Sequence, residues 1–62
     1  MKKMEYQVEK EKLESPVCIE TVRKNGLIES RMDYLNRLQI YFAVEESDSV
    51  FEIFVEEKAL ES

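Results

Sequence analysis

Two dense apolar runs stand out in the second half of the chain, in the stretch QIYFAVEESDSVFEIFVEE from residue 39 to residue 57. Four of the polar residues between them, 46–49, are typical of a loop that joins two antiparallel strands. With that loop, three successive strand pairs are apolar: Val44 with Phe51, Phe42 with Ile53, and Ile40 with Val55. We therefore predict a β-hairpin over residues 38–56 whose shared apolar face forms the core.

The other face of this hairpin is the best candidate for a binding surface. On the same register Tyr41 lies directly opposite Phe54, with Ala43 and Val50 near it and acids around it. An apolar centre inside a charged rim is typical of a protein interface, whereas the alternative is that a second layer of the same domain covers the aromatic pair. The candidate protein-binding residues are Tyr41, Ala43, Glu45, Glu52, Phe54 and Glu56.

The first half of the chain has weaker patterns. MEYQVEK alternates apolar and polar residues and predicts a strand over residues 4–10. VCIETV is rich in β-branched residues and favours a strand over residues 17–23, although Ser15 followed by Pro16 is also compatible with a helix start. Within LIESRMDYLNRL the apolar positions follow a helical stripe, which predicts a helix near residues 27–37. The members of that stripe are Ile28, Met32, Leu35 and Leu38.

Two alternatives compete with these elements. Asn25-Gly26 is a strong hairpin signal, and a hairpin turning there would place Glu20 opposite Arg31 as a cross-strand pair. Ser49 and Glu52 match a helix capping box, so the second apolar run also has a helical interpretation. We predict an α+β fold, a small antiparallel sheet built on the 38–56 hairpin with one helix; an all-β meander and then an all-α unit are the alternatives.

Length and composition narrow the classes of function. The 62 residues predict a single small domain, 1–62. So short a chain buries little apolar area and needs further stabilisation from a disulfide, a bound metal or a partner. A single cysteine, Cys18, excludes an internal disulfide; we expect it to be a small buried hydrophobe. No histidine and only one glycine are present, so we expect no catalytic site, no cofactor and no metal site, and predict that the protein is not an enzyme.

Charge is distributed unevenly along the chain. Residues 1–43 carry eight Lys/Arg and seven Asp/Glu, whereas residues 44–62 carry seven Asp/Glu and one lysine, so the second half accounts for the net charge of −5. Such an acidic end repels a phosphate backbone, so nucleic-acid binding is disfavoured. It would attract a basic protein partner. The longest apolar run, IYFAV, is too short to span a bilayer and no apolar segment follows the basic start MKK, so we expect a cytoplasmic protein without membrane contact.

These observations predict a small acidic regulatory module that docks onto a protein partner without catalysis, as phage- or bacterium-encoded inhibitors do, and that forms a homodimer. The first alternative is a dimeric nucleic-acid-binding regulator that gathers the basic residues of 2–37 on one surface. The second alternative is a structural subunit of a larger assembly. The basic residues concerned are Lys2, Lys3, Lys10, Lys12, Arg23, Lys24, Arg31 and Arg37.

Overall fold

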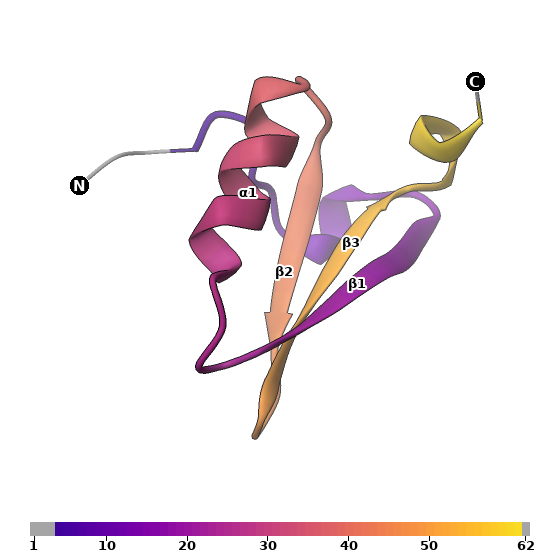
Figure 1. Ribbon diagram of the computed structural model, residues 1–62. Coiled ribbons are helices and arrows are strands. Elements are labelled where there is room, and N and C mark those ends of the chain that lie inside the picture. Colours follow the sequence, from indigo (N-terminus) through magenta and orange to yellow (C-terminus); the bar gives the residue numbers. More distant parts are fainter. Residues whose placement is uncertain (1–3, 62) are drawn as a thin grey trace.

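The computed structural model describes residues 4–61 and has the predicted α+β architecture (Figure 1). Three antiparallel strands form one sheet: β1 (Pro16–Arg23), β2 (Phe42–Glu46) and β3 (Val50–Glu56). Their order is β1-β3-β2, so the last strand in the sequence lies in the centre. One helix, α1 (Ile28–Arg37), connects β1 to β2, and two short 3-10 helices, η1 (Lys10–Lys12) and η2 (Glu57–Leu60), precede β1 and follow β3.

The hairpin of β2 and β3 is present, but its predicted register is wrong by two residues. Phe42 pairs with Val55 and Val44 with Ile53, because the chain turns over Asp48 and Ser49, and the Ser47 N–H donates to the Val50 carbonyl at 2.9 Å. A shift by two leaves every side chain on the face predicted for it. The pairing of Tyr41 with Phe54 is lost, since Phe54 lies opposite Ala43.

The core lies between α1 and one face of the sheet. Phe42, Ile53 and Val55 are almost completely buried there and pack against Leu35 of α1. Ile28 and Met32, two turns and one turn before Leu35 respectively, also contact this cluster, which explains why the sequence stripe forms a helix. Leu38, the fourth member of the predicted stripe, lies just beyond the helix and is half exposed.

The strand β1 is irregular in its middle. Cys18 pairs with Phe54 and Glu20 with Ile53, so Ile19 is the extra residue of a β-bulge. After the bulge Glu20 and Val22 lie on the face toward α1. Cys18 is exposed, not buried as predicted, because it points to the opposite face from an edge strand.

The predicted strand over residues 4–10 is reduced to a single parallel bridge between Gln7 and Phe42. Two backbone hydrogen bonds hold it: the Phe42 N–H donates to the Tyr6 carbonyl at 2.9 Å, and the Val8 N–H to the Phe42 carbonyl at 2.8 Å. The segment then turns into η1, which contacts β2 from the side away from α1. Residues 6–13 therefore close one edge of the sheet and pass from one face to the other.

Candidate functional site

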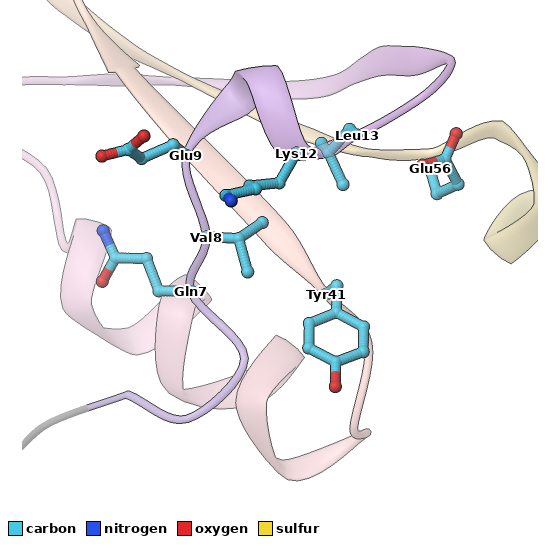
Figure 2. A pocket seen from close by; sticks show the side chains of 7 residues that line it. All are labelled: Gln7, Val8, Glu9, Lys12, Leu13, Tyr41 and Glu56. Carbon is cyan, nitrogen blue, oxygen red and sulfur yellow. The ribbon is translucent and has the colours of Figure 1, made fainter.

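A groove is present on the sheet face opposite α1, where residues 7–13 pass beside the hairpin (Figure 2). Its volume is about 540 Å³. The lining residues come from three parts of the chain: the bridge segment and η1, the residue before β2, and the end of β3. They are Gln7, Val8, Glu9, Lys12, Leu13, Tyr41 and Glu56.

The walls of the groove are mainly apolar. Leu13 is buried, Val8 is half-buried, and Tyr41 presents an exposed ring, with 56% of its surface accessible (Figure 2). That ring also contacts Tyr6, with a distance of 4.9 Å between ring centroids and an angle of 49° between the planes. Aromatic pairs favour such tilted arrangements, so Tyr6 fixes one side of Tyr41 and leaves the other to the groove.

Glu56 is a structural residue as well as a lining residue. Its carboxylate accepts hydrogen bonds from the backbone N–H groups of Glu14 and Ser15, at 2.8 and 2.5 Å. These contacts hold the turn before β1 against the end of β3, and the Glu57 N–H adds a bond to the Ser15 carbonyl at 2.9 Å. The carboxylate of Glu56 is therefore already bonded to backbone N–H groups of its own chain. The other charged side chains that line the groove are Glu9 and Lys12.

The other residues predicted for the binding surface do not line the groove. Ala43 is fully buried, so it is not the exposed centre of a surface. Phe54 is half-buried beneath the Lys10 ammonium, which lies 4.2 Å from the ring centroid. Glu45 and Glu52 lie directly opposite each other on β2 and β3, near the hairpin turn. Of the predicted set, Tyr41 and Glu56 line the groove.

Sequence reasoning missed the N-terminal half of the groove. The alternation in MEYQVEK indicated that Tyr6 and Val8 share one side of an extended segment, but not which strand the segment joins. Leu13 gave one usable signal, since it is the single apolar residue between Val8 and Pro16. An isolated apolar residue in a charged segment is a reasonable candidate for an anchor.

Three of the basic residues proposed for a nucleic-acid surface form ion pairs with acids. Lys24 lies 2.7 Å from Glu46, and Arg31 lies 2.7 Å from Glu20. Arg37 pairs with Asp33 at 3.1 Å, one helical turn away. Lys2 and Lys3 lie outside the described residues. Pairing with carboxylates leaves less positive charge for a phosphate backbone.

Residues 4–61 contain no cluster of three or more cysteine, aspartate or glutamate side chains arranged to hold a metal ion. In the same range no helix combines the length and apolar character needed to cross a membrane. We find no match for the chain among protein-family models, curated proteins or solved structures.

Proposed function

We propose that the protein is a non-catalytic binding module that holds an apolar side chain of a protein partner in the groove beside Tyr41. The observation that carries the proposal is the groove itself, with the exposed Tyr41 ring on its wall and Val8 and Leu13 around it (Figure 2). Aromatic residues at the centre of a concave apolar patch are typical anchors of protein interfaces.

The partner segment is expected to be basic on either side of its apolar anchor. Support comes from the charge of residues 44–62, which carry seven acids and one lysine and include the end of β2 and all of β3. Glu45 and Glu52 oppose each other on the groove side of the sheet, where two like charges destabilise the strand pair. A Lys or Arg of the partner placed between them would relieve this repulsion and add affinity.

Selection of peptides from a random displayed library tests the proposal. The bait is the full chain, and Tyr41→Glu is compared with a matched control, Tyr34→Glu, because Tyr34 on α1 has nearly the same exposure, 57% against 56%. We expect enriched peptides to share a large apolar residue flanked by Lys or Arg. They should bind the parent and Tyr34→Glu equally and bind Tyr41→Glu at least ~10-fold more weakly.

Two results would overturn the proposal. The first is a selection that enriches no sequence above the unselected library. The second is a set of enriched peptides that bind Tyr41→Glu as tightly as the parent. Chemical shifts of the backbone amides of Val8, Leu13 and Tyr41 on addition of an enriched peptide give an independent readout of where it binds.

A further inference from the structure

The sheet has one closed edge and one open edge. At the β2 edge the backbone of Phe42 is bonded to residues 6–8, as described above. At the other edge β1 pairs with β3 on its inner side, and the described residues add no strand on its outer side. An open strand edge presents unpaired N–H and C=O groups, so it is the natural place for another strand to add.

The backbone geometry identifies which groups of β1 are open. The Lys24 N–H donates to the Ser49 carbonyl at 3.2 Å, which extends the β1–β3 ladder one residue past Arg23. Because bonding direction alternates along an antiparallel strand, Glu20, Val22 and Lys24 bond toward β3, and Thr21 and Arg23 direct their backbone groups outward. The bulge at Ile19 and the missing N–H of Pro16 restrict regular pairing to this second half of the strand.

We propose that a second copy of this chain adds to the outer edge of β1 as an antiparallel strand, with the two Val22 residues facing each other on a two-fold axis. In this register Thr21 of one copy and Arg23 of the other exchange backbone hydrogen bonds. Glu20 lies opposite Lys24 of the second copy, and the symmetry repeats this ion pair. The strand therefore complements itself in backbone bonding, apolar contact and charge.

The contacts within one copy are compatible with this arrangement. Arg31 reaches only the Oε1 atom of Glu20, with its Nε at 2.8 Å and a terminal nitrogen at 2.7 Å. The second carboxylate oxygen of Glu20 is thus available to the Lys24 ammonium of the copy. That ammonium lies 2.7 Å from Glu46 of its own chain, and its three N–H donors allow it to bond both carboxylates. Residues 16–38 carry three acids and four basic residues, so the acidic excess of the hairpin and η2 lies one strand away from this edge.

This interface is independent of the proposed function. The groove is lined by residues of the 7–13 segment, Tyr41 and Glu56, and none of its lining residues belongs to the Glu20–Lys24 segment that would form the dimer. Five residues of strand pairing make a small contact, so the dimer is expected to be weak and to dissociate on dilution. The Tyr41→Glu variant should therefore lose peptide binding and still dimerise through β1. A failure of the proposed function can thus be distinguished from a failure of the proposed dimer.

Sedimentation equilibrium over a range of protein concentrations tests the dimer. We expect the parent to form a reversible dimer and Thr21→Pro to weaken it at least ~10-fold, because proline removes an outward N–H that the β1–β3 ladder does not use. Thr21→Ala keeps the N–H and should dimerise like the parent. A parent that stays monomeric, or a folded Thr21→Pro that still dimerises, overturns the proposal.

A cross-linking experiment keeps the test decisive if Thr21→Pro does not fold. Val22→Cys in a Cys18→Ser background places two thiols face to face on the axis, where mild oxidation should give a covalent dimer. Glu29→Cys in the same background is the control, on an exposed position of α1. Cross-linking of Glu29→Cys as fast as Val22→Cys, or none of Val22→Cys, contradicts the register.

Discussion

Arg31 of α1 and Glu20 of β1 form an ion pair, with a nitrogen to oxygen distance of 2.7 Å. The sequence pattern had paired the same two residues across a hairpin, whereas in the fold the contact joins a helix to a strand. The bulge at Ile19 explains the geometry, because it turns Glu20 to the face on which α1 packs. The pair therefore links the helix to the open edge of the sheet.

A double-mutant cycle on this pair should show a small coupling. Half of the Arg31 side chain and about a third of that of Glu20 are exposed, so solvent screens their attraction. We expect Glu20→Gln, Arg31→Met and the double variant to give a coupling free energy of ~0.5–1 kcal/mol in urea unfolding, decreasing at high salt. A coupling above ~2 kcal/mol would show that the pair is more desolvated than its exposure indicates.

The fully buried core of the hairpin should dominate stability. Ile53 has no exposed surface, and its truncation in Ile53→Ala leaves a cavity under α1. We expect a loss of ~2–5 kcal/mol in the free energy of unfolding, which is a large part of the total for so small a domain. Leu27→Ala is the matched control, since Leu27 is 77% exposed, and it should change stability by less than ~0.5 kcal/mol.

Cys18 should react with a thiol reagent in the native state. Its side chain is exposed on the edge strand, and its thiol makes a long contact, 3.7 Å from Sγ to the Glu20 carbonyl oxygen. We expect labelling by a neutral maleimide to have similar rates in native buffer and in denaturant. Native labelling that is ~100-fold slower would mean that the thiol is covered, and a dependence of that protection on protein concentration would identify a second copy as the cover.

Gln39 is a position at which glycine should stabilise the fold. Its φ of 60° is left-handed, and it follows α1 in a Schellman-type end, where the Gln39 N–H donates to the Asn36 carbonyl and the Ile40 N–H to the Leu35 carbonyl. Glycine adopts this conformation without a Cβ penalty, so Gln39→Gly should raise the free energy of unfolding by ~0.5–1 kcal/mol.

Gln39→Ala is the control for this substitution, because alanine shortens the side chain but keeps the Cβ. It should leave the thermal midpoint unchanged or lower it. Equal gains from alanine and glycine would attribute the effect to the side chain and not to the backbone.

The hairpin and the helix were predictable because their apolar periodicity is strong, whereas the register of the hairpin and the order of the strands in the sheet were not. Moving the hairpin by two residues keeps Phe42, Val44, Ile53 and Val55 on the core face, so the apolar pattern cannot choose between the two registers. The choice depended on the turn over Asp48 and Ser49. That turn lacks the Asn-Gly or Asp-Gly signal from which turn geometry is usually inferred.

The candidate site was predictable only in part for a related reason. Tyr41 was identified because it is a large aromatic residue on the face of the hairpin that does not form the core. Its surroundings depend on residues 6–13, which reach the site through one bridge at Gln7 and the buried Leu13. The exposure of Cys18 depends on its place at the sheet edge, and strand order follows from long-range pairing that a local pattern does not contain.

One wall of the groove, residues 7–13, belongs to no strand. Ligand binding in the groove is therefore linked to the conformation of this N-terminal segment. The N-terminal segment is attached to β2 by the two bonds that Tyr6 and Val8 make with Phe42, so the groove exists only in molecules in which this segment is docked. A ligand that binds the docked form must shift the docking equilibrium toward it, and its apparent affinity is scaled by the docked fraction. Hydrogen exchange at the Val8 and Phe42 amides would then slow in proportion to ligand occupancy. The exchange rates of these two amides therefore measure how strongly ligand binding is coupled to docking of the N-terminal segment.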